Sequence, residues 1–236
     1  MKLDILATLN AEREARRAVI LVTNVASGKS RLVKAADVPK DPLRAALAER
    51  LRTGKSGIVE TPEGHAFFTV YVPAPQLVIT GAVHISQALA PIGKMLGYDV
   101  TIIDPRTAFA SPERFPDVKV IAEWPDQALP PLNVDRYTAF VALTHDPKID
   151  DPALAHALKR DCFYIGALGS RKTHARRVER LKQQGFSDAD IARIQAPIGL
   201  DIGAVSPAEI AVAIMAQITE KLREEADAEP AIKAAS

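Results

Sequence analysis

The sequence predicts an α/β protein in which a parallel sheet, covered by helices on both faces, follows a small α/β amino-terminal domain. Apolar strands alternate with helical patterns from residue 76 onward, which is typical of a parallel sheet. The stretch QLVITGAVHISQALAPIGKMLGYDVTIID at 76–104 has the order strand, glycine turn, helix, strand. This order is that of the first βαβ unit of a dinucleotide-binding fold, so the larger domain is predicted to be Rossmann-like.

The composition limits the class of protein. The chain has 236 residues, 47% of them apolar, which is enough for a sizeable core. Its 30 basic and 29 acidic side chains give a net charge of +1, which favours neither nucleic acid nor a membrane surface as a partner. The single cysteine, Cys162, excludes an internal disulfide. Without a signal peptide or an apolar run approaching 18 residues, we expect a soluble cytoplasmic protein.

Pro73, Ala74 and Pro75 mark the boundary between two predicted domains, 1–74 and 75–222, with a frayed tail at 223–236. In the first domain the patterns predict a helix, a strand, a second helix and a hairpin, at 1–17, 18–25, 42–52, and 57–61 with 66–72. In the second domain five strands are predicted at 77–80, 100–103, 118–122, 138–143 and 162–165. Helices are predicted from 84 to about 97, from Asp150–Pro152 to 159, and at 172–183, 187–194 and 206–220, while 197–203 fits either a strand or a loop.

The glycine turn after the first strand of the larger domain departs from the dinucleotide fingerprint. Gly-x-Gly-x-x-Gly requires glycine at 81, 83 and 86, and the chain has Gly81, Val83 and Ser86. A branched side chain at 83 obstructs the approach of a pyrophosphate to the backbone. Asp104 stands where a ribose-binding carboxylate is expected, although it fits equally the capping of Arg106 and of the turn at Pro105.

Ligands of open parallel sheets bind beyond the carboxyl ends of the strands, and polar residues follow several of the predicted strands. The candidate cofactor-binding residues are Gly81, His84, Asp104, Arg106, Thr144, His145, Asp146, Gly166, Gly169, Ser170, Arg171 and Asp201. His84 fits a ligand or a helix cap. His145 and Asp146 fit an acid/base pair, metal ligands or a helix start, and one histidine near Asp150 is a weak metal signal, so no metal ligand is assigned.

The turn from Gly166 to Arg171 is the predicted anion site. Two glycines let backbone N–H groups converge at the start of a helix, while Ser170 and Arg171 add donors. The alternative is an ordinary strand-to-helix turn with solvated arginines. Cys162 begins an apolar strand, which favours a structural thiol over sulfur transfer.

Five segments together resemble the XdhC/CoxI family of accessory proteins for bacterial molybdenum hydroxylases: VITGAVHISQALA, TIIDPR, ALTHD, YIGALGSRKTHARR and PIGLDIGAVSPAEIA. The resemblance covers about 73–220. It implies a chaperone that holds the molybdenum cofactor, a molybdopterin or its cytosine dinucleotide, during sulfuration by a cysteine desulfurase. The cofactor is then delivered to a target enzyme such as xanthine dehydrogenase or carbon monoxide dehydrogenase.

Two departures suggest a short or divergent member of that family. The family usually has Gly-Ala-Gly-His where this chain has Gly81, Ala82, Val83 and His84, and it commonly carries a Gly-Gly-Cys segment, whereas residues 1–72 contain no cysteine.

Three hypotheses for function remain open at this point. The first is the cofactor-binding chaperone, with no catalytic residue assigned. The second is an NAD(P)-dependent oxidoreductase that uses Asp104 for ribose and His145 as acid/base. The third is a purely structural subunit or a regulator, with a vestigial crevice. The Ala-rich last helix fits packing on the sheet or a homodimer contact.

Overall fold

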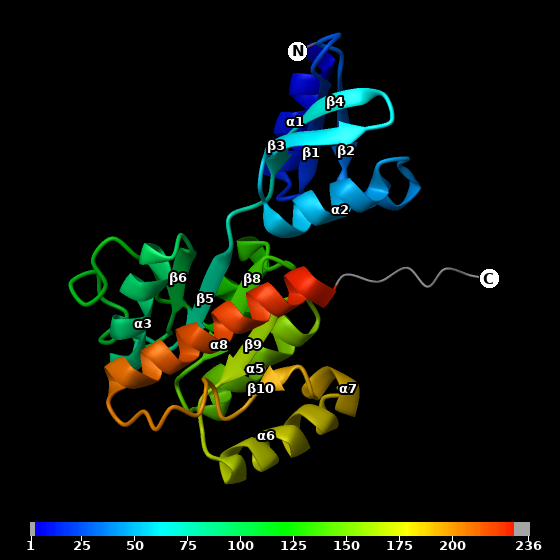
Figure 1. The fold of residues 1–236 in the computed structure, drawn as a ribbon. Helices are drawn as coiled ribbons and strands as arrows, with labels where there is room; N and C mark the ends of the chain where they lie inside the picture. Colours follow the sequence, from blue (N-terminus) through cyan, green and yellow to red (C-terminus); the bar gives the residue numbers. More distant parts are fainter. Residues whose placement is uncertain (1–2, 229–236) are drawn as a thin grey trace. The chain divides into compact units, whose positions relative to one another are not determined.

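The computed structural model describes residues 3–228, which form two compact units that divide between Pro73 and Ala74 (Figure 1). The smaller unit is a four-stranded antiparallel sheet with the order β2-β1-β4-β3. Its strands are β1 (Val19–Asn24), β2 (Ser30–Lys34), β3 (Gly57–Thr61) and β4 (Gly64–Tyr71). Its helices are α1 (Leu3–Glu14), the 3-10 helix η1 (Ala35–Lys40) and α2 (Arg44–Thr53).

Strand β2 is absent from the sequence prediction. It forms because Gly28, at φ +67, turns the chain back so that Ser30 pairs with Thr23 of β1. Its sequence, SRLVK, has only one fully buried position, Val33, and is therefore a weak strand signal. The core of this unit includes Ile20, Leu47 and Phe68.

The larger unit is a six-stranded parallel sheet with the order β10-β9-β8-β5-β6-β7. The strands are β5 (Gln76–Thr80), β6 (Asp99–Ile103), β7 (Lys119–Ile121), β8 (Thr138–Ala142), β9 (Tyr164–Ala167) and β10 (Ile194–Gln195). Numbered within the unit, this order is the 3-2-1-4-5-6 of dinucleotide-binding folds, with the chain changing direction between β5 and β8. The predicted fold class is therefore confirmed.

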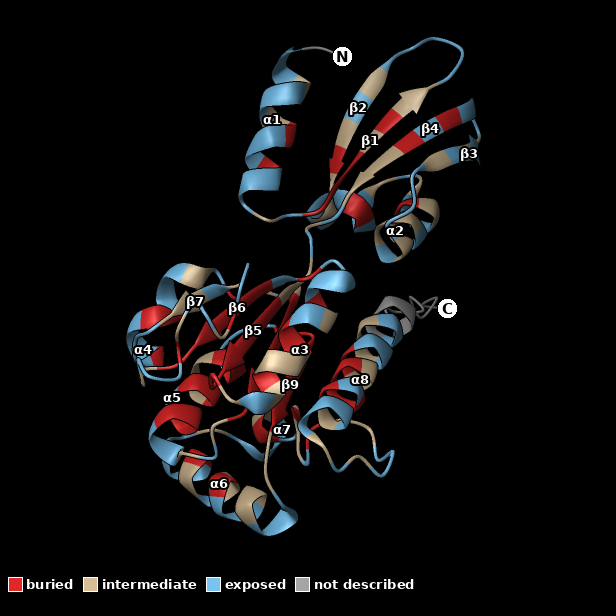
Figure 2. Cartoon of the chain, turned by 90° about the vertical axis from the view of Figure 1, so that its left-hand side faces the viewer, coloured by how far each residue is buried: buried red, intermediate tan, exposed pale blue. Residues whose placement is uncertain are grey.

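Helices cover both faces of this sheet (Figure 2). On one face α3 (His84–Met95) and α8 (Pro207–Ala228) pack on Leu77 and Ile79 of β5. On the other face lie α4 (Pro125–Ala128), the 3-10 helix η2 (Pro130–Leu132), α5 (Pro147–Leu158), α6 (Arg171–Gln183) and α7 (Asp188–Ile191), packed around Val78 and Phe140. Successive strand residues point to opposite faces, so the apolar run of β5 serves both layers.

Four elements of the larger unit begin or end where the sequence prediction does not place them. Strand β9 runs from Tyr164 to Ala167 and not over 162–165, so Cys162 precedes it and Gly166, predicted to follow the strand, lies within it. Helix α5 starts at Pro147, with Asp146 as its N-cap, and it contains the Asp150–Pro152 segment that was expected to open it. Helix α7 ends at Ile191, because the chain then enters the short strand β10 within the predicted helix 187–194. Helix α8 continues to Ala228, beyond the predicted end near 220, and the rest of the predicted tail, 229–236, lies outside the described residues.

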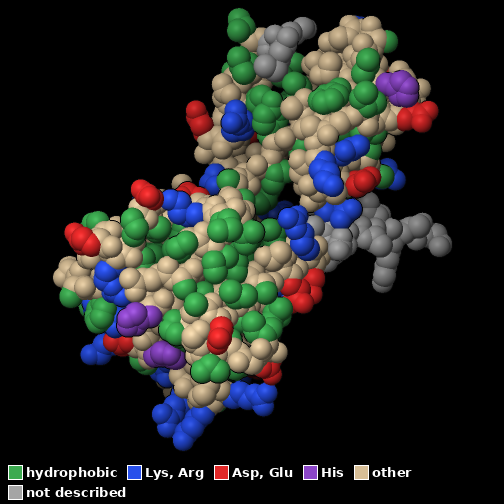
Figure 3. Space-filling view, turned by 60° about the vertical axis from the view of Figure 1, so that its left-hand side comes forward, with side chains coloured by type: hydrophobic (Ala, Val, Ile, Leu, Met, Phe, Trp, Pro, Cys, Tyr) green, Lys and Arg blue, Asp and Glu red, His purple; other side chains and the backbone are tan. Residues whose placement is uncertain are grey.

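Hydrophobic side chains spread over one face of the larger unit (Figure 3). The exposed apolar residues of that unit include Met95 and Leu96 at the end of α3 and Ile202, Val205 and Val212 around the start of α8. Within residues 3–228, no helix is both long and apolar enough to cross a membrane.

Candidate functional site

The centre of the site is the point where β5 and β8 diverge. Gly81, directly after β5, has φ +110, and a Cβ on it would lie 2.9 Å from Thr144 Cγ2 and 3.2 Å from the carbonyl carbon of Leu143. Glycine is required here by both the backbone conformation and the close approach of the segment after β8. The structure thus brings two predicted site residues, Gly81 and Thr144, side by side.

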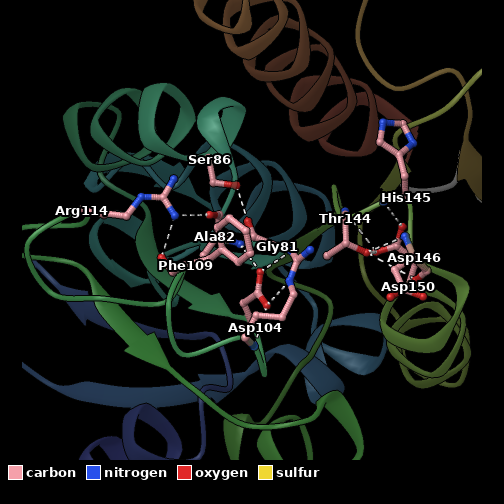
Figure 4. Close-up of polar contacts among 11 residues, drawn as sticks. Gly81, Ala82, Ser86, Asp104, Phe109, Arg114, Thr144, His145, Asp146 and Asp150 are labelled. Atoms are coloured by element: carbon pink, nitrogen blue, oxygen red, sulfur yellow. Dashed lines mark hydrogen bonds and ion pairs between the residues drawn. The ribbon is translucent and has the colours of Figure 1, made fainter.

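The turn after β5 is held by bonds within the protein (Figure 4). The N–H of Ala82 donates to Asp104 Oδ2 at 2.8 Å, and Ser86 Oγ donates to the carbonyl of Gly81. Arg114 Nη1 donates to the carbonyls of Ala82 and Phe109, each at 2.9 Å. In a dinucleotide-binding turn the backbone N–H groups face a pyrophosphate. In this chain the N–H of Ala82 already donates to Asp104, so it does not face a ligand.

Asp104 caps this turn. Its carboxylate, 0% exposed, also accepts from Arg106 N, Nε and Nη2 at 3.0, 2.9 and 2.7 Å. Burial raises the pKa of Asp104, but the hydrogen bonds from Arg106 and Ala82 outweigh it and hold the pKa below its usual value. Of the two alternatives for Asp104, the structure shows the capping of Arg106, because the carboxylate presents no open face to a ribose.

Arg106 follows β6 and is bonded to Asp104. Its guanidinium lies 4.6 Å from the ring centroid of Phe109, and its side chain is 35% exposed. The hydrogen bonds to Asp104 raise the pKa of Arg106, and the charges of Asp104, Asp146 and Asp150 add to this effect. Phe109 and Arg114 were not among the predicted site residues. One feature of the sequence could have indicated them. The loop that follows β6 and Asp104 contains an aromatic residue, Phe109, between two arginines.

The segment after β8 is organised by Asp150, which is 1% exposed. Its Oδ1 accepts from Thr144 Oγ1 at 2.6 Å, and its Oδ2 accepts from the N–H of His145 at 3.0 Å. Asp146 accepts from the N–H of Lys148 at 2.9 Å as the N-cap of α5. Burial raises the pKa of Asp150, and the bonds from Thr144 offset part of this rise.

His145 takes a left-handed conformation, φ 62, and its exposed ring points away from Asp104 (Figure 4). Among the described residues, no hydrogen bond joins its imidazole to Asp146. The acid/base pair suggested by the sequence is therefore not assembled, and the helix-start alternative accounts for Asp146.

The predicted anion turn has structural explanations for most of its residues. A Cβ on Gly166 would lie 2.6 Å from Ile198 Cδ1, so that glycine is needed for packing. Gly169 has φ +133, and a Cβ on it would lie 3.1 Å from Thr173 Cγ2. Ser170 Oγ accepts from the N–H of Thr173 at 3.2 Å as the N-cap of α6, and Arg171 is exposed. The turn lies next to the segment after β8, since a Cβ on Gly169 would be 3.8 Å from His145 Nδ1. The N–H of Thr173, however, already bonds to Ser170 within the turn.

The remaining predicted residues are peripheral. His84 is exposed at the first position of α3, whose N-cap, Val83, makes no side-chain capping bond. Asp201 is exposed in the loop between β10 and α8. Across the part of the chain that the structure describes, no hydrogen bond or ion pair joins either residue to the other candidates.

The structure also bears on metal and sulfur chemistry. Within residues 3–228, no three or more His, Cys, Asp or Glu side chains are grouped to hold a metal ion. Cys162 is 7% exposed and packs in the core beneath α5, and burial raises its pKa to about 12. These properties are those of a structural thiol.

The strand order, the switch point between β5 and β8, and the polar strand ends define a Rossmann-type protein whose first turn is capped from within. The chain belongs to the family described as the XdhC Rossmann domain, which matches residues 77–218. The resemblance to XdhC proteins noted in the sequence is confirmed.

Three curated bacterial proteins and one solved structure are similar to it. The uncharacterized protein YqeB of Escherichia coli is 31% identical over 156 residues, which are 65% of this chain and 28% of YqeB. The E. coli molybdenum cofactor insertion chaperone PaoD is 29% identical over 69% of this chain and 45% of its own length. A Bacillus subtilis protein described as a probable xanthine dehydrogenase component is 31% identical over 63% of this chain and 43% of its own length.

The chain thus spans less than half the length of these curated relatives. A crystal structure of a xanthine dehydrogenase from Bacillus halodurans superposes with a TM-score of 0.68 at 24% identity, covering 97% of this chain and 69% of that one. At this identity the superposition shows a shared fold.

Proposed function

We propose that this protein is an accessory chaperone for a molybdenum hydroxylase, which binds the molybdenum cofactor at the carboxyl ends of β5, β6, β8 and β9. The observation that carries the proposal is the combination of an intact switch point with a first turn that is capped by Asp104 and Arg114. Such a scaffold keeps the crevice of a nucleotide-binding fold, while the N–H of Ala82 in its first turn is bonded within the protein. Membership of the XdhC family and the similarity to a molybdenum cofactor insertion chaperone support the same conclusion.

The donors at the strand ends fit the chemistry of this cofactor. Molybdopterin is a phosphate-bearing anion, and its pterin ring is a planar hydrogen-bonding heterocycle. Arg106 and His145 present partly or fully exposed donors, and Phe109 offers an aromatic surface beside Arg106. The bound cofactor supplies the molybdenum chemistry of the target enzyme, whereas this chain would hold and orient it.

The oxidoreductase alternative has less support. It requires Asp104 to receive a ribose hydroxyl and the first turn to receive a pyrophosphate. Both groups are engaged within the protein, since Asp104 is 0% exposed and the N–H of Ala82 donates to it.

Several finer features follow the family resemblance. The cofactor would be held during sulfuration by a cysteine desulfurase and inserted into the apo-enzyme, a xanthine dehydrogenase or carbon monoxide dehydrogenase. It would be molybdopterin itself or its cytosine dinucleotide. The cytoplasm is the compartment in which these partners would meet it. The exposed apolar residues around α3 and α8, Met95 and Val205 among them, are a candidate surface for a homodimer or for the target enzyme.

The test is an anaerobic calorimetric titration of the protein with molybdenum cofactor and, in parallel, with NAD(H) and NADP(H). We expect micromolar binding of the pterin cofactor, a free energy of about −8 kcal/mol, and none of the nicotinamides. The variant His145→Asn tolerates the left-handed backbone and removes the imidazole. It should weaken cofactor binding about tenfold, the effect of losing one charge-assisted hydrogen bond.

His65→Asn is the matched control, because His65 is an exposed histidine on β4 of the smaller unit. Nicotinamide binding without pterin binding would refute the chaperone function. Equal loss in the His145 and His65 variants would remove His145 from the site.

A further inference from the structure

A pocket of about 190 Å³ lies between α5 and α6, next to the end of β8. Eight residues line it, and most are charged: His145, Pro147, Asp150, Asp151, Thr173, Arg176, Arg177 and Arg180. The volume is below the range of pockets that enclose a whole drug-sized ligand, so it suits one functional group of a ligand. Because His145 belongs to both, the pocket adjoins the strand-end site.

Arg177 is the unusual member of this lining. Its side chain is 2% exposed, and Nη2 donates to the carbonyl of Leu168 at 2.9 Å. Its Nε and Nη1 have no hydrogen-bond partner among the described residues. A buried guanidinium with two unpaired nitrogens is costly, since each unpaired donor has lost its water and gained nothing in return.

The carboxylates nearby do not satisfy Arg177. Asp150 Oδ2 lies 4.0 Å from Arg177 Nη2, too far for a hydrogen bond, and the Asp150 oxygens already accept from Thr144 and His145. Asp151 is engaged by Arg180, whose Nε donates to Oδ2 at 2.5 Å and whose Nη2 donates to Oδ1 at 3.0 Å. Three arginines therefore face two carboxylates, which leaves an excess of one positive charge at the pocket.

We propose that this pocket is a phosphate-binding site, in which Arg176 and Arg177 donate to the oxygens of a phosphate group carried by a pterin cofactor. The arrangement supplies what a phosphate requires, namely a fixed guanidinium, a second guanidinium at the rim and the hydroxyl of Thr173. A bound phosphate would also place negative charge beside a buried guanidinium that no carboxylate fully pairs. The assignment of the phosphate to a pterin cofactor rests on the proposed function.

The first test is titration of the whole chain with inorganic phosphate, followed by calorimetry and by ³¹P NMR. We expect saturable binding with a dissociation constant of about 1 mM or below. Arg177→Met keeps an unbranched apolar stem and removes the guanidinium, so it should abolish phosphate binding. The melting temperature should fall, because the carbonyl of Leu168 and the buried Asp150 lose a partner. Arg176→Ala, at an exposed position of the lining, should weaken binding at least fivefold.

Arg160→Ala is the matched control, because Arg160 is an exposed arginine just beyond the end of α5 that does not line the pocket. It should leave phosphate affinity unchanged. Absence of phosphate binding by the unaltered chain, or equal weakening by the Arg160 and Arg176 variants, overturns the site. The Arg176 comparison decides this even where Arg177→Met does not fold.

The second test separates the source of the phosphate. If it belongs to the cofactor, inorganic phosphate competes with molybdenum cofactor, and Arg176→Ala weakens binding of both. Cofactor binding that is unaffected by Arg176→Ala and by phosphate overturns the assignment of this pocket to the cofactor but leaves the chaperone function intact. Phosphate binding by a chain that binds no cofactor refutes the chaperone function and, with it, the cofactor as the source.

Discussion

Gly81→Ala should destabilise the larger unit more than an alanine at any glycine whose Cβ would meet open space. At φ +110 the added methyl costs about 1–2 kcal/mol in backbone conformation. Its Cβ would also lie 2.9 Å from Thr144 Cγ2 and 3.2 Å from two backbone atoms, and such overpacking costs about 1–3 kcal/mol. The expected loss is therefore about 2–5 kcal/mol of unfolding free energy.

Fluorescence of Trp124, the single tryptophan, reports denaturant unfolding of this unit. Gly97→Ala is the control, since Gly97 has φ +84 and nothing within 4 Å of a Cβ, so it should cost only about 1–2 kcal/mol. Thr144→Ser removes Cγ2 while keeping the hydroxyl bonded to Asp150, and in the double variant it should recover part of the Gly81→Ala loss. Equal costs at Gly81 and Gly97, or no recovery, would refute the close-approach argument.

Three further outcomes are expected. Because the folded pKa of Asp104 is lowered, its contribution to stability is present above its ordinary pKa of about 3.9 and is lost as pH falls through the lowered, folded-state pKa. Asp104→Asn should cost about 1–3 kcal/mol at pH 7 in denaturant unfolding, and this difference should narrow as the pH is lowered below that range. Cys162, whose pKa is raised to about 12, should react with a disulfide reagent at pH 8 only as fast as the chain unfolds, and rapid labelling of the native protein would contradict its burial. Glu12 is bonded to Arg17 and Lys34, which lower its pKa from 4.5 to about 2. Circular dichroism should therefore show the smaller unit losing stability as the pH falls from 4.5 to about 2, and Glu12→Gln should remove this pH dependence.

The sequence predicts the sheet well because its strands are defined by local pattern. Leu77, Val78 and Ile79 form a continuous apolar run, and such runs occur where both faces of a parallel strand are covered. The start of α5 shows the limit of local pattern. Asp146–Pro147 and Asp151–Pro152 are equivalent helix-start signals, and the first is used because burial of Asp150 against Thr144 and His145 requires the helix to have begun already.

The role of Asp104 depends on contacts that no local pattern contains. Its position relative to Gly81 indicates a carboxylate at the end of the second strand of the unit, which the structure has. Whether that carboxylate meets a ribose or a backbone N–H depends on Ala82, 22 residues earlier in the chain, and on the conformation of Arg106. Val83 and Ser86, where the fingerprint requires glycine, were the signs in the sequence that the first turn differs from a dinucleotide site.

Helix α6 illustrates how periodicity could have moved the anion prediction from the turn to the helix. Thr173, Arg176, Arg177 and Arg180 have the spacing i, i+3, i+4 and i+7, which places them on one face, whereas Arg171 and Lys172 fall outside this set. A helix that turns three arginines toward a neighbour needs negative charge opposite them, and α5 supplies only Asp150 and Asp151. The pairing of Arg180 with Asp151, and the bonding of Asp150 to the backbone after β8, then leave Arg177 as the guanidinium without a full set of acceptors. An anion at this position would complete the contact between the two helices and would also fix the segment that carries His145.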